Sequence, residues 1–341
     1  YDMLLEKPFA PNEHEMREIV DCAKKNDSKV MICHVLRYTP FYYAIKERVY
    51  NGEIGDIINI QQTEHVSYHH LSTSYVRGKW ANSKKCHTSM LLAKSCHDMD
   101  IMMWMMSATK PTQIASFGSK FQFKPENAPD GAGTICMKDC PYVDTCVYST
   151  KRLYIDHPDR WAFYVWDALE GKENPTIEDK IELMKSDSPY ARCIYKCDND
   201  VVDHQSVLIN FASGATGTLN MIGGSAEPRR DIHIIGTKGE IFGNFEESKF
   251  TVLKIDPSPE AHHEECDVEE VDLKVTGDMV GAYGGHGGGD ERLAADFVKF
   301  IRGEKPSLAC TSIFDSVAGH LCVYLADNSR ENGGIPQEVK L

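Results

Sequence analysis

The sequence has fewer basic than acidic residues and no long apolar run. Its 37 lysines and arginines face 51 aspartates and glutamates, which gives a formal net charge of −14. Such a surface repels phosphate backbones and anionic lipid, so we expect neither nucleic acid nor a membrane as a partner. The longest purely apolar run in the first half, residues 101–106, is far too short to span a bilayer. With 42% hydrophobic residues over 341 positions, the composition predicts two globular domains with substantial cores.

An initiator methionine and a secretion signal are also missing. Tyr1 opens directly onto strand-like sequence, with no basic, apolar and small-residue segments in signal-peptide order. We interpret residue 1 as an internal point of a longer polypeptide and expect a cytoplasmic location. No G-x-G-x-x-G follows a strand, so a dinucleotide phosphate loop is not recognisable in this chain. The glycine-rich run 284–290 precedes a helix near the C-terminus, and we expect it to be a substrate-side loop.

The first 38 residues have the pattern of a strand–helix–strand unit. Residues 2–6 and 29–35 are short apolar stretches typical of buried strands, and residues 12–26 have helical spacing. Asn12 with Glu15 three residues later fits a capping box. This spacing is typical of a parallel βαβ unit. We therefore predict that residues 1–38 are the end of a doubly wound α/β domain.

From residue 39 to 341 the pattern predicts a second domain, of α+β class. Short apolar segments separated by Gly, Asn or Ser turns indicate an open, mostly antiparallel sheet with helices on one face. A polar stretch at 122–200, rich in Cys, Pro and Tyr, interrupts this domain as a long insertion. The expected strands are 56–64, 113–118, 207–211, 216–221, 231–236, 240–245 and 249–255, and the expected helices are 40–51, 88–106, 290–302 and 311–328.

Twelve cysteines are many for this length, and their spacing is irregular. We favour reduced thiols, because disulfide frameworks are typical of much smaller secreted domains. Within the insertion, Cys136, Cys140 and Cys146 have C-x3-C-x5-C spacing, and Cys193 and Cys197 follow. Four thiolates could hold a structural zinc ion, although this is not a standard zinc spacing. Zinc, free thiols and a disulfide remain alternatives at this point.

Five segments, in their order along the chain, resemble signatures of the Gfo/Idh/MocA oxidoreductase family. Glu6-Lys7-Pro8, at the end of a buried strand, is similar to the family's E-K-P motif. The resemblance covers the chain from end to end apart from 122–200. The other four segments are 35–40 after the next strand, 52–55 before the first strand of the second domain, 97–104 in a central helix, and 236–241 between late strands.

The resemblance implies a fold, an activity and several site residues. It implies a Rossmann domain whose first part precedes this chain, an NAD or NADP cofactor, and an oxidoreductase that acts on a sugar or glycoside. It places Glu6, Lys7, Pro8 and Arg37 beside the cofactor. It makes Lys7 and His97 candidate catalytic residues, because an ammonium polarises a hydroxyl and imidazole titrates near neutral pH. The open sheet suggests a homo-oligomer.

The chain departs from the family pattern one helical turn before His97. Many members carry an aspartate four residues before this histidine, and this chain has Ala93 there, followed by Lys94. Lys94 is therefore a candidate second cation in catalysis.

Candidate substrate contacts follow the first strand of the second domain and lie in the glycine-rich run. Aromatic faces stack on sugar rings, while Arg and Lys bond hydroxyls or carboxylates. An ordinary polar loop explains the first group about equally well. The candidates are Tyr68, His69, Arg77, Trp80, His286 and Asp290.

Three functions are consistent with these residues. The first is reversible hydride transfer between a sugar ring carbon and nicotinamide. The second is glycoside hydrolysis by transient oxidation at C3, elimination, addition of water and re-reduction; the missing aspartate and Lys94 fit the extra proton transfers that it needs. The third is a non-catalytic scaffold or sensor, against which Lys7 and His97 argue. We rank plain oxidoreduction first, and the sequence identifies neither the sugar nor NAD against NADP.

Overall fold

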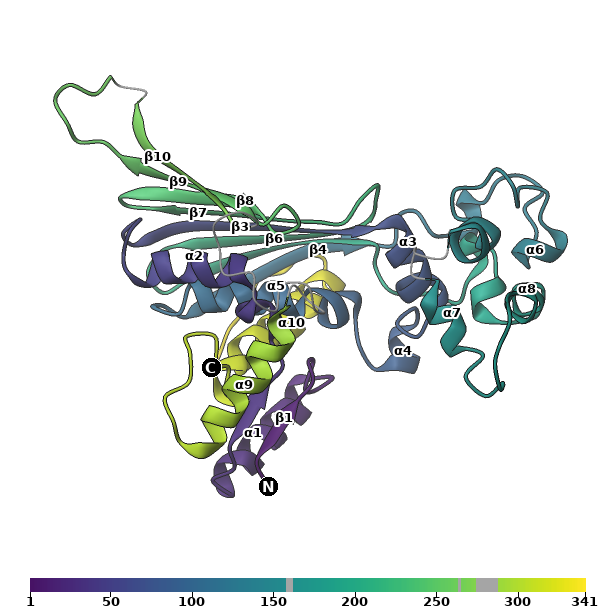
Figure 1. Ribbon diagram of the computed structural model, residues 1–341, viewed down its shortest axis with the longest axis horizontal. Coiled ribbons are helices and arrows are strands. Elements are labelled where there is room, and N and C mark those ends of the chain that lie inside the picture. Colours follow the sequence, from purple (N-terminus) through teal and green to yellow (C-terminus); the bar gives the residue numbers. More distant parts are fainter. Residues whose placement is uncertain (158–161, 263–264, 274–287) are drawn as a thin grey trace.

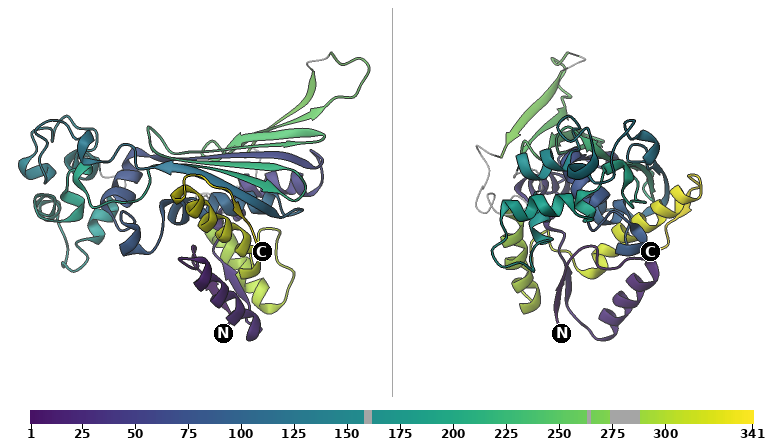
Figure 2. Two further views of the ribbon diagram at one scale, coloured as in Figure 1. Left: turned by 180° about the vertical axis from the view of Figure 1, so that it is seen from behind. Right: turned by 90° about the vertical axis from the view of Figure 1, so that its right-hand side faces the viewer.

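A single nine-stranded sheet forms the middle of the molecule. The computed structural model describes residues 1–157, 162–262, 265–273 and 288–341. Helices pack on one face of the sheet, and a small N-terminal unit lies beneath those helices (Figure 1). The insertion forms a lobe at one end of the sheet, far from the hairpin of β9 (Lys249–Ile255) and β10 (Cys266–Asp272) at the other (Figures 1 and 2).

The N-terminal unit is a parallel pair of short strands joined by one helix. β1 (Met3–Leu5) pairs in parallel with β2 (Val30–Ile32), and α1 (Glu13–Lys25) connects them. Asn12 caps α1, because its side chain accepts a hydrogen bond from the N–H of Glu15. The predicted βαβ order is confirmed, and the short helix η1 (Val35–Tyr38) follows β2. The domain boundary at residue 38 stays a prediction.

The sheet has the strand order β10-β9-β8-β7-β3-β6-β5-β4-β11. Its pairs are antiparallel except β3–β6, which is parallel, so the predicted mostly antiparallel sheet is confirmed. β10 and β11 are not among the predicted strands. The bounds are β3 Ile57–Ser67, β4 Pro111–Ser119, β5 His204–Phe211, β6 Thr216–Ser225, β7 Arg229–Gly236, β8 Gly239–Asn244, β9 Lys249–Ile255, β10 Cys266–Asp272 and β11 Gln337–Glu338.

Helix α5 (Met90–Met105) is buried along almost its whole length between the sheet and α10 (Ile313–Glu331). α2 (Pro40–Tyr50) lies beside it on the same face of the sheet, and α9 (Gly289–Arg302) packs against η1. Alternation in β3 agrees with this cover: Gln62 and Glu64 are buried, whereas Gln61 is exposed on the open face. No described helix is both long and apolar enough to cross a membrane.

The insertion leaves the sheet after β4 and returns at the start of β5, where Ser119 and His204 are paired. It contains more helix than its sequence pattern indicates, and it has a small core of its own around Leu153, Tyr154 and Met184. It rests on the helical segment after β3. That segment comprises α3 Tyr68–His70, η2 Leu71–Arg77 and α4 Ser83–Cys86, and the insertion comprises η3 Pro125–Asn127, α6 Cys136–Asp139, η4 Lys151–Asp156, α7 Phe163–Asp167, α8 Ile177–Lys185, η5 Pro189–Ala191 and η6 Ile194–Lys196.

Candidate functional site

Lys7 lies just beyond the carboxyl end of β1, the edge at which parallel sheets bind ligands. Its Nζ donates a hydrogen bond to the carbonyl of Ala93 in the first turn of α5, at 3.3 Å. His97 lies four residues further along α5, on the same face of the helix. The two candidate catalytic residues are 90 positions apart in sequence. The fold brings Lys7 into contact with α5 one turn before His97, which is part of that helix.

Buried imidazoles surround this point. The His97 ring lies 6.0 Å from the ring of His34, which follows β2, and His34 lies 5.8 Å from His320 of α10. Burial lowers the pKa of His34 well below its ordinary value, and burial also lowers the pKa of His320 to about 4. The positive charge of Lys7 contributes to both shifts, so its ammonium lies close to these rings.

His70, at the end of α3, is also a very weak base. Burial, followed by the charges of Lys94 and Arg230, lowers its pKa from 6.5 to about 2, and Lys7 adds to the shift. The ring is therefore neutral at physiological pH. Such a weak base suits hydrogen bonding to a hydroxyl better than proton abstraction, which works best when the pKa lies near the operating pH.

The neutral state of His70 predicts a specific acid sensitivity. Below pH 6.5 an unfolded chain binds a proton at this position and the folded chain does not, so stability is lost as pH falls. We expect His70→Gln to make the slope of unfolding free energy against pH shallower by about 1.4 kcal/mol per pH unit between pH 6 and 4. Urea unfolding at several pH values measures this slope. Replacement of His14, whose side chain is 80% exposed, is the control and should leave the slope unchanged.

Lys94 belongs to a buried network of charges between α5 and the sheet. Its Nζ lies 3.0 Å from Glu64 Oε1, and the Nε of Arg230 lies 2.6 Å from Glu64 Oε2. Arg230 Nε also donates to Asp98 Oδ1 at 3.0 Å. Two cations and two carboxylates thus balance one another in this network. The predicted second catalytic cation, Lys94, is one of the two cations. The catalytic role of Lys94 stays a prediction, and its observed partner is Glu64.

Arg37, predicted beside the cofactor, is buried at 4% exposure. Its Nε and Nη2 donate to the two carboxylate oxygens of Asp100 at 2.7 and 2.6 Å, a bidentate pair. Its guanidinium also lies over the ring of Trp104, 5.4 Å from the centroid. In this arrangement Arg37 fixes η1 against α5.

The predicted substrate contacts fall into separate places. Arg77 is buried and donates to the carbonyls of Arg192 and Tyr148, so it holds the insertion against the helical segment after β3. The face of Trp80 is covered by the ammonium of Lys79, 4.8 Å from the ring centroid. The observed partners of Arg77 are thus in the insertion, and the observed partner of Trp80 is Lys79. Neither set of contacts involves Lys7.

Tyr68 and His69 are half-buried at the end of β3, and the ring of Tyr68 lies 6.1 Å from that of Tyr148 in the insertion. Asp290 is exposed in the first turn of α9. Burial and Glu6, together with the charge of Asp290, raise the pKa of the Cys33 thiol to about 12, which places Asp290 near the strand ends. His286 lies outside the described residues.

All twelve cysteines are free thiols. Among the described residues, no group of three or more His, Cys, Asp or Glu side chains is arranged to hold a metal ion. The expectation of reduced thiols agrees with this finding, and the structural zinc stays a prediction without a site.

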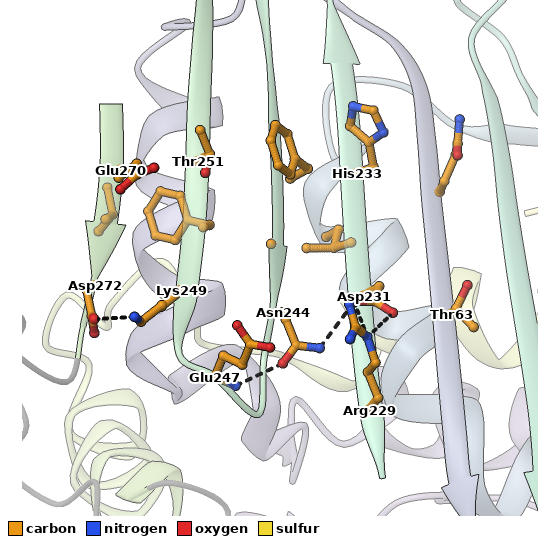
Figure 3. A pocket seen from close by; sticks show the side chains of 16 residues that line it. Thr63, Arg229, Asp231, His233, Asn244, Glu247, Lys249, Thr251, Glu270 and Asp272 are labelled. Atoms are coloured by element: carbon orange, nitrogen blue, oxygen red, sulfur yellow. Dashed lines mark hydrogen bonds and ion pairs between the residues drawn. The ribbon is translucent and has the colours of Figure 1, made fainter. Parts of the chain in front are cut away.

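A hollow lies on the open face of the sheet, away from Lys7. It has a volume of about 640 Å³ and is floored by β7, β8 and β9 (Figure 3). Arg229 pairs with Asp231, and Lys249 pairs with Asp272, at 2.8 Å each. Because successive strand residues point to opposite faces, Arg229 lies in this hollow while Arg230 reaches the buried charges beneath α5.

Sequence reasoning missed Glu64, Arg230 and His320. A signal for the first was present, because Glu64 occupies a buried position in the alternation of β3, and a charge at such a position needs a partner. The sequence around Arg230 and His320 gives no signal for their partners. Those partners, Asp98 and Phe9, lie more than 130 positions away in the sequence.

The sequence and the fold both match known oxidoreductases. Residues 46–312 match the model described as the oxidoreductase family, C-terminal alpha/beta domain, of Gfo/Idh/MocA proteins. The putative oxidoreductase YteT of Bacillus subtilis (strain 168) is 25% identical over 300 residues, which are 86% of this chain and 66% of that protein. This chain therefore spans just under two thirds of that relative's length.

Solved structures show the same fold at low identity. Levoglucosan dehydrogenase, in complex with NADH and levoglucosan, has a TM-score of 0.65 and 16% identity over 100% of this chain and 74% of that one. A super-repressor mutant of Gal80p from Saccharomyces cerevisiae has a TM-score of 0.61 and 14% identity over 98% and 71%. The predicted fold class is confirmed. Since the family model matches most of its length, this chain belongs to the Gfo/Idh/MocA oxidoreductase family.

Proposed function

We propose that this chain is part of a nicotinamide-dependent oxidoreductase that removes a hydride from a ring carbon of a sugar or glycoside. The observation that carries the proposal is the hydrogen bond from Lys7 Nζ to the Ala93 carbonyl, which puts a half-buried ammonium one helical turn from His97. A cation and an imidazole in one place suit the proton half of alcohol oxidation. The levoglucosan dehydrogenase neighbour, in complex with NADH and levoglucosan, supports a sugar and an NAD-type cofactor.

Lys7 and His97 act on different atoms of the reacting hydroxyl. The Lys7 ammonium donates a hydrogen bond to the hydroxyl oxygen and stabilises the negative charge that grows there as the C–H bond breaks. His97 accepts the hydroxyl proton. The neutral ring of His70 hydrogen-bonds a neighbouring hydroxyl and orients the sugar.

The strand ends suit a nicotinamide, because this edge of a parallel pair binds ligands and because Glu6 is exposed there beside the half-buried Pro8. Glu6, Lys7 and Pro8 would lie beside the ring, with the binding contacts made by Glu6 and Pro8 and the Lys7 ammonium given to the reacting hydroxyl; Arg37 would take part only after leaving Asp100. A bound nicotinamide supplies the hydride acceptor. NAD and NADP are both compatible with these residues.

A second candidate function is glycoside hydrolysis without net oxidation. The observation in its favour is the buried network of Lys94, Glu64, Arg230 and Asp98, which puts four ionisable groups directly beside Ala93, the position of the family aspartate. Elimination and re-addition of water need proton transfers that plain oxidation does not. Against the scaffold function, the chain retains Lys7 and His97.

One assay separates the three functions. The full-length protein is incubated with NAD and nitrophenyl glycosides, or with the matching free sugars, while nitrophenol and NADH absorbance are followed together. Stoichiometric NADH without nitrophenol supports the dehydrogenase. Nitrophenol without net NADH supports the glycosidase. Silence in both channels, with cofactor binding confirmed, supports the scaffold and contradicts the proposal.

We also propose that the open sheet face binds a second copy of the chain. Leu208, Ile222 and Phe242 are 50%, 39% and 40% exposed on strands of this sheet, which adds apolar surface to the polar hollow of Figure 3. Light scattering is expected to give at least twice the monomer mass, and a monomer mass at micromolar concentration would contradict the proposal.

A further inference from the structure

Helix α10 holds the segment after Lys7 through a side chain rather than through backbone pairing. Pro8 has no N–H, so the Phe9 N–H is the first backbone donor after Lys7. This N–H is buried and donates to Nε2 of His320 at 3.3 Å. The ring of Phe9 also lies against His320, with centroids 4.4 Å apart. A histidine 311 positions away thus satisfies the first donor after Lys7.

Two further residues on the same face of α10 contact the strand ends. One turn after His320, Tyr324 donates its hydroxyl proton to the carbonyl of Ala10 at 2.7 Å. One turn before it, Ser316 Oγ lies 2.7 Å from Nε2 of His34 and 3.1 Å from Nδ1 of His320. One helical face therefore holds the segments that come after both β1 and β2.

The backbone partners fix the tautomer of His320. Because the Phe9 N–H points at Nε2, a neutral ring carries its proton on Nδ1, where the carbonyl of Ser316 accepts it at 3.1 Å. A protonated ring would set one N–H against another. Burial, which lowers the pKa of His320 to about 4, keeps the ring in its accepting form at neutral pH. His320 is thus an acceptor rather than an acid or base.

We propose that His320 is a positioning residue that sets the Lys7 ammonium relative to His97. The inference rests on the proposed function, in which Lys7 contacts the reacting hydroxyl. α10 also packs on α5, with Gly319 close to Asp100, so the helix that holds the Lys7 segment also contacts the helix that carries His97. Loss of the hydrogen bond from the Phe9 N–H to His320 frees the segment that carries Lys7, while His97 stays fixed on α5. A misplacement of about 1 Å between reacting groups can lower the rate about 100-fold.

The test compares two replacements of His320 in the full-length protein. His320→Leu removes the acceptor and is expected to lower kcat about 10- to 100-fold, with KM changed less than about threefold. His320→Gln places an amide oxygen near Nε2 and is expected to restore most of kcat. Ser329→Ala is the matched control, because Ser329 on α10 likewise accepts from a buried N–H, that of Ser116, and its loss should lower Tm without changing kcat.

A second readout needs no substrate. The rate at which trinitrobenzenesulfonate labels Lys7, followed by peptide mass spectrometry, is expected to rise in His320→Leu and to return towards wild type in His320→Gln. Wild-type kcat and labelling in the leucine variant would overturn the proposal, as would equal loss of kcat in both variants with labelling unchanged. If the wild type oxidises no sugar, the proposed function fails and the labelling rates alone decide this inference.

Discussion

Lys7→Met in the full-length protein is expected to lower kcat for sugar oxidation by about 10³-fold, with the NADH dissociation constant changed by less than about threefold. Methionine keeps the length and apolar volume of the side chain and removes the ammonium. The hydroxyl oxygen then loses the donor that stabilises its charge, so the loss falls on the transition state rather than on substrate binding. Stopped-flow NADH absorbance and quenching of protein fluorescence by NADH measure the two quantities.

Lys29→Met is the matched control for this prediction. Lys29 Nζ also donates to a backbone carbonyl, that of Ile301 at 2.7 Å. Lys29 precedes β2, so it lies at the amino end of that strand and away from the carboxyl ends where Lys7 lies. Its loss should lower Tm and leave kcat within about twofold of wild type. If Lys7→Met weakens NADH binding more than tenfold and spares kcat at saturation, then Lys7 holds the cofactor and does not act on the hydroxyl.

Arg37→Met is expected to destabilise the protein by roughly 3–5 kcal/mol, because it leaves the Asp100 carboxylate buried without its bidentate partner. The NADH dissociation constant should change little. The double variant Arg37→Met/Asp100→Leu removes both charges and is expected to recover most of the lost stability. Urea unfolding of the wild type and the three variants, with Asp100→Leu alone as the third, completes a double-mutant cycle.

The same experiment decides the cofactor role predicted for Arg37. If Arg37→Met retains wild-type stability and weakens NADH binding at least tenfold, then the guanidinium exchanges Asp100 for the cofactor. If the free energy of unfolding falls and the NADH dissociation constant is unchanged, then Arg37 stabilises the packing of η1 against α5 and does not bind the cofactor.

Features encoded locally could be predicted from the sequence. The spacing of apolar residues predicts α1, and the capping pattern predicts its first turn at Asn12. The E-K-P motif after a strand-like stretch predicts that Lys7 lies just beyond the carboxyl end of a strand, which the structure shows; its catalytic role stays a prediction. β10 has no such signal, since its alternation is masked by charged, exposed residues at the edge of the sheet.

The partners of the site residues could not be predicted, because they depend on tertiary packing. Lys94 is visible as a departure from the family pattern, but its pairing with Glu64 depends on how α5 lies across β3. His320 is an ordinary helical histidine in sequence, and only the packing of α10 brings it to Phe9. Arg77 is a similar case: the sequence predicts a ligand contact, which stays a prediction, and it does not indicate that Arg77 donates to the carbonyls of Arg192 and Tyr148 in the insertion.

The two ends of the insertion meet, so the lobe begins and ends at one point of the sheet. Ser119 and His204 are paired neighbours on β4 and β5, and Asp203 accepts hydrogen bonds from the N–H groups of Phe121 and Gln122. The whole lobe therefore occupies the place of a hairpin turn. A change in the length of the lobe would therefore leave the register of β4 and β5 unchanged, so relatives can differ in this lobe while they share the sheet that carries it.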